Sequence, residues 1–312
     1  MKTTQQRHAQ RIQRVIDHIH DHLAEDIDSA TVAEVAHLSA YHWHRIYVAV
    51  TGESAVATLR RVRLQRTATE LLRDDRPVAE IAAECGFDNL QAFTRLFSRT
   101  YGMPPGRFRH GGKSGIQPQP SSSSNARIGA AADRSGSAGD APESETVGPV
   151  VDESSDARSV TIAERAPLRL IGLWHQGDYH DIGRVFEKIM AAAEIESWPR
   201  SETFTVGVYF DDPDVIPEER CRSFAGIPVP EDFRTPDGYE TQNVPGGLHA
   251  SCLHVGPYAM LPRSYRWLYR EWLRDAAQDA RDEPCYEAYL NTPYNTPPAE
   301  LETLICMPLE EA

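Results

Sequence analysis

Long hydrophobic runs are absent from this chain of 312 residues, and residues 1–13 are polar. A membrane-spanning helix needs about 20 consecutive apolar residues, and a secretory leader needs an apolar central region. We therefore expect a protein that is neither exported nor inserted into a membrane and that works in the cytoplasm.

Cysteine is scarce, and no two of the five cysteines have Cys-x-x-Cys spacing. An odd number without a spacing pattern predicts reduced, buried thiols rather than disulfides or a zinc site. The run of histidines near the N-terminus does not predict a metal site, since only His18 and His22 share a helix face and no further ligand lies near them in sequence. The sequence also lacks a Ser-His-Asp or Cys-His constellation, so we predict no catalytic residues, no metal and no cofactor.

Basic charge is scarce outside the first third of the chain. The formal net charge is −14, yet residues 1–110 hold 15 Lys or Arg against 13 Asp or Glu, whereas residues 150–312 hold 14 against 29. A strongly acidic surface is repelled by a phosphate backbone. The N-terminal part is therefore the candidate for nucleic-acid binding, and the acidic part should face away from the duplex.

The first third contains a duplicated helix-turn-helix pattern. Val32–Ala36 recurs as Val78–Ala82, and Arg45–Gly52 recurs as Arg95–Gly102, with a turn four residues longer in the second copy. Two such motifs on one chain predict contacts with successive major-groove segments about 34 Å apart. We expect a monomer to suffice for DNA binding.

The residues that carry this pattern are Ile81-Ala82, Gly86-Phe87, Phe93 with Phe97, and Gly102-Met103-Pro104-Pro105 before Phe108-Arg109. Through them the region from Val15 to Arg109 resembles the AraC family of transcription factors. The resemblance implies an all-α, double helix-turn-helix DNA-binding domain over residues 1–112, with double-stranded DNA and RNA polymerase as partners. One departure is Val48-Ala49-Val50, where the family usually has basic residues; it implies a weaker grip on DNA, or a different recognition sequence, at the first motif.

Helix ends and buried faces follow from local chemistry. Thr31 to Glu34 forms a capping box, Pro77 suits a first turn, and Ser39 and Asp88 can cap the two recognition helices. Spacing of i, i+3 and i+4 predicts three core residues in each recognition helix. These are Trp43, Ile46 and Tyr47 in the first and Phe93, Leu96 and Phe97 in the second.

The outer faces of these helices suit the reading of base edges, because Arg can pair with guanine, Gln or Asn with adenine, and Thr with a thymine methyl. Half or more of protein–DNA hydrogen bonds go to the DNA backbone, so a phosphate role for Arg45 or Arg95 stays open. For the arginines between and after the motifs, phosphate contacts and intramolecular salt bridges both stay open. The predicted DNA-binding residues are Tyr41, His42, His44, Arg45, Arg61, Asn89, Gln91, Thr94, Arg95 and Arg99.

Residues 113–159 are rich in Ser, Gly and Pro and include four consecutive serines. This composition offers no apolar face to bury and predicts a disordered linker with a root-mean-square reach of roughly 35–40 Å. We expect the linker to join two domains without fixing their relative orientation.

A second duplication lies within residues 160–312. Tyr209–Pro213 returns as Tyr289–Pro293, and Ser223–Val229 returns as Thr303–Leu309, both displaced by 80 positions. Each copy predicts a strand, a Gly-x-Tyr turn, an amphipathic helix and two strands joined by a Pro-rich loop. Two copies side by side predict a duplicated α+β domain with pseudo-twofold symmetry and a groove between its halves.

This second pattern resembles the GyrI-like effector-binding domain, through His254–Tyr258, Trp267-Leu268, Tyr286–Leu290 and Ile305–Leu309. The resemblance implies a transcriptional regulator controlled by a small-molecule effector. It also implies that Glu287 lies at the base of an aromatic pocket, as a matching Glu does in family members that bind cationic drugs.

Strand alternation puts Glu287 on one face with Cys285 and Tyr289, and its repeat equivalent is Gly207. An aromatic box with one carboxylate fits a lipophilic cation. Alternatively, these aromatic residues are ordinary core of a sheet packed on helices. The predicted ligand-binding residues are Trp174, Tyr209, Tyr258, Trp267, Glu287 and Tyr289.

A second hypothesis adds catalysis. Some GyrI-like proteins are similar hydrolases of electrophilic small molecules, and Glu287 could serve as a general base on water. No further catalytic constellation supports this hypothesis, so we predict a regulator that is not an enzyme, with a bifunctional hydrolase as the alternative.

Overall fold

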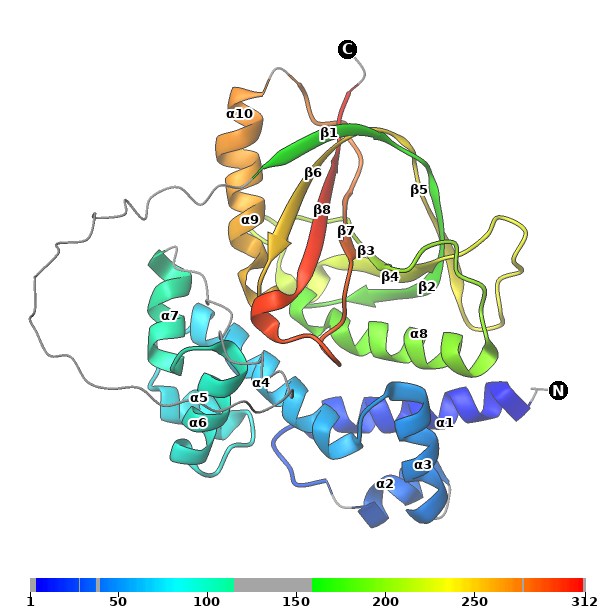
Figure 1. Cartoon of the computed structure of the whole chain (residues 1–312), viewed down its shortest axis with the longest axis vertical. Coiled ribbons are helices and arrows are strands. Elements are labelled where there is room, and N and C mark those ends of the chain that lie inside the picture. Colours follow the sequence, from blue (N-terminus) through cyan, green and yellow to red (C-terminus); the bar gives the residue numbers. More distant parts are fainter. Residues whose placement is uncertain (1–3, 28, 38–39, 115–158, 277, 311–312) are drawn as a thin grey trace, which may run out of the picture.

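A computed structural model describes residues 4–27, 29–37, 40–114, 159–276 and 278–310 of the chain. Its N-terminal half is helical, and its C-terminal half is an antiparallel sheet with helices packed against it (Figure 1). The predicted fold class, a double helix-turn-helix domain followed by a duplicated α+β domain, is confirmed.

The N-terminal half contains two helix-turn-helix units, α2 with α3 and α5 with α6, joined by the long helix α4. Helix α1 precedes the first unit and α7 follows the second. The bounds are α1 Thr4–Asp21, α2 Ser29–Ala36, α3 Ala40–Thr51, α4 Ala55–Arg73, α5 Val78–Glu84, α6 Leu90–Tyr101 and α7 Pro105–Ser114.

The observed helix ends correct part of the expected capping. Helix α6 is capped by Asn89, whose Oδ1 accepts a hydrogen bond from the backbone N–H of Ala92 at 2.9 Å, and not by Asp88. Helix α2 begins at Ser29, so Thr31 lies within the helix instead of opening it. Pro77 precedes α5 at the N-cap position, where its missing N–H costs nothing. The predicted cap Ser39 lies outside the described residues.

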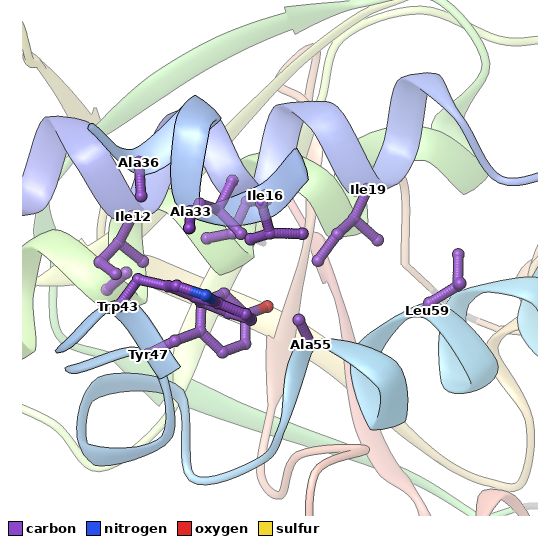
Figure 2. Close-up of a cluster of buried hydrophobic side chains, with 12 residues drawn as sticks. Ile12, Ile16, Ile19, Ala33, Ala36, Trp43, Tyr47, Ala55 and Leu59 are labelled. Carbon is purple, nitrogen blue, oxygen red and sulfur yellow. The ribbon is translucent and has the colours of Figure 1, made fainter. Parts of the chain in front are cut away.

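Each helix-turn-helix unit has its own apolar core. Figure 2 shows the first, in which Trp43 and Tyr47 of α3 pack beneath the isoleucines of α1. In the second, Phe93 and Phe97 are buried as predicted, while Leu96, like Ile46 in the first unit, is only partly buried. All five cysteines are free and buried, which confirms the predicted burial, and their reduced state stays a prediction.

Among the described residues the strands form one eight-stranded antiparallel sheet in the order β1-β6-β8-β7-β3-β4-β2-β5. Helix α8, and a segment made of α9, the π-helical turn η4 and α10, pack on one face of this sheet. The strand bounds are β1 Val160–Arg165, β2 Leu168–Gln176, β3 Thr205–Tyr209, β4 Arg222–Pro228, β5 Glu240–Val244, β6 Gly247–Val255, β7 Cys285–Tyr289 and β8 Glu302–Pro308. The helical bounds are η1 Tyr179–Asp181, α8 Ile182–Glu196, η2 Glu218–Arg220, η3 Tyr258–Met260, α9 Leu261–Trp267, η4 Leu268–Trp272, α10 Leu273–Asp275 and η5 Pro298–Glu300.

The sheet order explains the 80-residue repeat. Strands β2, β3 and β4 with α8 match β6, β7 and β8 with the α9 segment, and the two copies meet where β3 pairs with β7. Gly207 and Glu287 are equivalent in the repeat and are also direct cross-strand partners. The pseudo-twofold axis therefore passes through this pair, which places Glu287 at the centre of the sheet.

The two halves of the chain pack against each other, which corrects the expectation of independent orientation. Helix α1 lies along α8 (Figure 1), with Ala9 and Ala191 buried in the contact. Ion pairs join Asp17 to Arg184 at 2.7 Å and Arg66 to Asp181 at 2.9 Å. Sequence patterns could not reveal this contact, because its partners are more than 100 residues apart. Helix α7 also reaches Ser114, two residues into the expected linker; residues 115–158 lie outside the described part.

Candidate functional site: an effector cleft and a DNA-reading surface

A cleft of about 2050 Å³ opens on the helical face of the sheet, and residues of both halves line it. Five of the six predicted ligand-binding residues lie on its wall: Tyr209, Tyr258, Trp267, Glu287 and Tyr289. They come from β3, η3, α9 and β7, so the sheet supplies the floor and the helical segments supply the sides. The role of these side chains in binding remains a prediction, but the structure brings them together.

Glu287 is the charged group at the floor of the cleft, with an exposed fraction of 4%. The Tyr289 hydroxyl donates a hydrogen bond to Glu287 Oε2 at 2.6 Å, and the hydroxyls of Tyr209 and Tyr289 lie 2.5 Å apart. The buried Tyr265 hydroxyl, near the same carboxylate, completes no well-formed hydrogen bond with a described residue. A row of phenols therefore surrounds one carboxylate.

Burial controls the ionisation of this group. Desolvation raises the pKa of Glu287 to about 7, although the nearby phenol hydroxyls of Tyr289, Tyr265 and Tyr209 act in the opposite direction. Burial and the nearby Glu287 charge also raise the pKa values of Tyr209 and Tyr289 well above the usual range, so both phenols stay protonated. Among the described residues Glu287 has no Lys, Arg or His within ion-pair distance.

Trp174 is the predicted ligand-binding residue that the structure contradicts. Its ring packs on Phe210 and Phe224, its Nε1 donates to Glu240 at 3.2 Å, and it does not line the cleft. Side chains alternate between the faces of a strand, and Ile171 of the same strand packs in the α8 core, so Trp174 lies on the face away from the helices. The repeat alignment matched its position along the chain but did not distinguish the two faces.

Several further aromatic residues line the cleft and were missing from the prediction, among them Phe186, Tyr265 and Tyr294. The Phe186 and Tyr289 rings meet edge to face with centroids 5.1 Å apart. Phe186 and Tyr265 belong to the apolar faces of the two predicted amphipathic helices, and that spacing was the available signal. Tyr294 lies in a loop, where no periodic pattern could identify it.

The second recognition helix presents most of its predicted contact residues to solvent. Gln91, Arg95 and Arg99 are exposed, and neither arginine forms an ion pair with a described residue. Asn89 is exposed too, but its side-chain oxygen caps the helix. The Thr94 hydroxyl donates to the Leu90 carbonyl at 2.8 Å, which leaves its methyl group as the part suited to a base contact.

The first recognition helix is described less completely. His44 and Arg45 are exposed on α3. The side chains of Tyr41 and His42 lie outside the described residues. A DNA-reading role for these four positions therefore stays a prediction.

Arg61 is not free to contact DNA, and its predicted role there is wrong. Its Nη2 lies 2.7 Å from Glu53 and 2.9 Å from Glu187, and its side chain is 13% exposed. The ring of Tyr294 covers its guanidinium at 4.6 Å. Of the two alternatives that the sequence left open, the intramolecular salt bridge is correct, and its partner Glu187 lies 126 residues away in the other half.

Comparison with known families agrees with this division. Residues 32–111 match a helix-turn-helix domain model, and residues 158–310 match the GyrI-like small molecule binding domain. No helix in the described part of the chain is long and apolar enough to cross a membrane.

Three relatives illustrate the matches. The regulatory protein SoxS of Salmonella typhimurium is 31% identical over 33% of this chain and 96% of its own length. The HTH-type transcriptional regulator YbfP of Bacillus subtilis is 37% identical over 31% of this chain, and the match covers only 33% of YbfP. A DNA gyrase inhibitor of Citrobacter rodentium is 29% identical over 44% of this chain and 85% of its own length. On these matches and the two domain models, the chain belongs to the AraC-type helix-turn-helix transcriptional regulators and carries a GyrI-like small-molecule-binding domain.

Proposed function

We propose that the chain is a sequence-specific regulator of transcription whose DNA binding responds to a lipophilic, aromatic cation held in the cleft. The observation that carries the proposal is Glu287, a buried carboxylate without a cationic partner among the described residues, at the floor of an aromatic cleft. Burying an unpaired charge is costly, and the charge of a bound cation would offset that cost.

The aromatic walls favour the same class of ligand. Tyr209, Tyr258 and Tyr289 supply aromatic rings to the cleft wall, and a cation over an aromatic face gains about 0.5–2 kcal/mol. The pairing with Glu287 takes place away from water, where Coulomb attraction exceeds its value at the surface. A neutral ligand of the same shape would leave the carboxylate unpaired and should bind less tightly.

The proposal for the N-terminal half is that α3 and α6 read bases of double-stranded DNA, and that RNA polymerase is the further partner of the bound regulator. Arg95 of α6 is the strongest candidate because it is exposed and forms no ion pair with a described residue. Arg95→Ala should cost about 1–3 kcal/mol on the preferred duplex and relax its sequence preference. If the ratio of specific to random-duplex affinity stays unchanged in this variant, Arg95 contacts only the backbone.

The effector proposal is tested by calorimetry on the full chain with tetraphenylphosphonium, a bulky aromatic cation that does not titrate, and with triphenylphosphine oxide as the neutral aromatic comparison. We expect the cation to bind more tightly. We also expect the affinity for a duplex selected by the full chain from random sequences to change when the cation is added. Equal affinities for the two probes would contradict a carboxylate-based cation site.

Hydrolysis is the second candidate function, and one observation favours it: a carboxyl group with a pKa near 7 is matched to general-base work at neutral pH. Incubating the full chain with small electrophiles and following their loss would detect turnover. Turnover that disappears in Glu287→Gln would support the hydrolase, whereas no turnover would leave the regulator.

A further inference from the structure

We propose that the effector site is shared between the two halves of the chain, with Tyr294 and Arg61 as its wall on the DNA-binding side, and that occupancy is transmitted from this wall to the first recognition helix. This inference rests on the proposed function of the cleft. The residues involved, Tyr294 and Arg61, lie on the α4 side of the cleft and not on the sheet floor.

The cleft extends beyond the sheet to the DNA-binding half. Arg61, Gln65 and Thr69, at successive turns of α4, line it together with Tyr294 and Glu187 of the effector domain. A molecule that fills the cleft from Glu287 toward α4 therefore touches both halves. Such a molecule is an elongated or bulky aromatic cation, because a small one would reach only the floor.

Tyr294 is the point of contact between cleft and interface. It lies in the loop between β7 and η5, lines the cleft, and covers the Arg61 guanidinium at 4.6 Å. Its equivalent in the first copy of the repeat is Asp214, which cannot offer a ring. The two copies thus differ at this loop, as they also differ at Gly207 and Glu287. In both cases the residue that distinguishes the second copy, Tyr294 or Glu287, lines the cleft.

Arg61 is the centre of a buried polar network that joins three helices. It pairs with Glu53 at 2.7 Å and with Glu187 of α8 at 2.9 Å. The second carboxylate oxygen of Glu187 lies 3.0 Å from Nε2 of His20 on α1. The exposed fractions of these four side chains are between 8% and 13%, so little water is present to replace a lost partner.

The network ends at the first recognition helix. Thr58 of α4 donates a hydrogen bond to Glu53 at 2.9 Å, and its Oγ1 lies 2.9 Å from the hydroxyl of Tyr47. Tyr47 belongs to α3 and is 1% exposed in the core of the first helix-turn-helix unit. Each step from Tyr294 to Tyr47 is a direct contact, which gives a continuous physical connection between the cleft wall and α3.

A ligand pressed against Tyr294 changes how well the ring shields Arg61. The charges of a buried network stabilise one another, so a change in the exposure of Arg61 alters the energy of its ion pairs with Glu53 and Glu187. This change shifts the packing of α4 and α3 relative to α8. Coupling between two sites is reciprocal, so DNA must change the affinity for the cation by the same factor by which the cation changes the affinity for DNA.

The test measures that factor on the full chain, as the ratio of duplex dissociation constants with and without saturating tetraphenylphosphonium. For the wild type we expect a factor of about 5–150 in either direction. Tyr294→Phe keeps the ring and should preserve the factor. Tyr294→Leu loses the ring while leaving the Arg61 ion pairs in place, and its factor should fall toward 1. The matched control is Arg76→Gln, which removes an arginine paired with Asp74 and Glu84 outside the cleft and should leave the factor unchanged.

The outcomes separate this inference from the function on which it rests. A wild-type factor of 1 despite Glu287-dependent cation binding, or a Tyr294→Leu variant with the wild-type factor, overturns the shared wall and leaves the effector site standing. Failure of the wild type to bind the cation, or binding that is identical in Glu287→Gln, overturns the effector site and the shared wall with it. Thermal denaturation of Tyr294→Leu verifies that the variant is folded.

Discussion

Glu187 on α8 and Glu287 on β7 are both buried carboxylates, yet their surroundings shift their pKa values in opposite directions. Arg61 and His20 beside Glu187 lower its pKa to about 2 against the effect of burial. Within the described part of the chain the polar groups that act on Glu287 are phenols, and burial raises its pKa to about 7. The first carboxylate is neutralised within the chain, at the contact between the two halves. The second has no such cationic partner among the described residues, in agreement with the proposed cation site.

Burial alone therefore does not identify a binding site. A buried carboxylate with two cationic neighbours is part of the protein's own structure, whereas one surrounded only by hydrogen-bond donors suits a ligand charge. The Gly207 position agrees with this view. A Cβ there would lie 3.0 Å from the Tyr209 ring, so the first copy of the repeat leaves space for an aromatic wall and the second supplies the charge.

We expect the greatest effect from a substitution that leaves Glu187 without its main cationic partner, so that its surroundings resemble those of Glu287. Arg61→Met removes its main cation and leaves a buried, poorly paired charge, which typically costs about 3–5 kcal/mol. We expect the N-terminal half to unfold at a markedly lower urea concentration, as monitored by the helical circular dichroism signal. The double variant Arg61→Met, Glu187→Met should recover most of the loss, because apolar groups of similar volume replace such pairs at little cost. A double variant as unstable as the single one would show that the ion pair itself is needed.

The converse change removes the charge at the cleft. Glu287→Gln keeps the shape of the side chain, so it should weaken tetraphenylphosphonium binding about ten- to a hundredfold, corresponding to a lost charge-assisted contact of about 1.5–3 kcal/mol. Duplex affinity without effector should stay the same. Calorimetry with the full chain measures both, and Glu240→Gln, which removes a carboxylate on the opposite face beside Trp174, is the matched control. An equal loss in the control would mean that the overall acidity of the domain attracts the cation.

Part of the surroundings of Glu287 could be predicted from the sequence. The 80-residue repeat predicted three strands in each copy, the pseudo-twofold arrangement and the equivalence of Gly207 with Glu287, because a repeat is visible in a single chain. The structure adds β1 and β5 and shows that Gly207 and Glu287 are also cross-strand partners. Alternation correctly placed Cys285, Glu287 and Tyr289 on one face of the strand, and the structure shows that this is the helix-covered face. These features are local or periodic, and local rules describe them well.

Contacts between distant segments could not be predicted in this way. The partnership of Arg61 with Glu187 depends on how α4 and α8 meet, and an arginine on a helix has the same local signature whether it faces DNA or another domain. The position of the Tyr294 ring over Arg61 depends on the path of its loop, which no local pattern predicts. The capping of α6 by Asn89 rather than Asp88 is a one-residue difference, within the usual uncertainty of helix ends.

A smaller effect is expected from pH on cation binding. The ligand does not titrate, so it binds the ionised form of Glu287, and the fraction of that form rises as pH passes the pKa of about 7. Binding to the wild type should strengthen by up to about tenfold per pH unit below 7 and level off above it. In Glu287→Gln the affinity should hardly change between pH 6 and 8. A wild-type profile as flat as that of the variant would mean that the carboxylate is already ionised at pH 6.

A further effect concerns stability and follows from the opposite directions of the two shifts. Between the ordinary pKa of 4.5 and about 7, the folded chain holds a proton on Glu287 that the unfolded chain releases, so this group makes stability fall as pH rises. Glu187, with its pKa lowered to about 2, contributes stability that is complete above 4.5 and is lost as pH falls toward 2. The urea midpoint of the C-terminal half in Glu287→Gln should therefore gain on that of the wild type from pH 5 to pH 7, with a constant difference above pH 7. Glu187→Gln should show no such gain in this window, because Glu187 is ionised throughout it in both states. A constant difference between Glu287→Gln and the wild type across the whole range would show that the carboxyl keeps its ordinary pKa and would remove the contrast between the two groups.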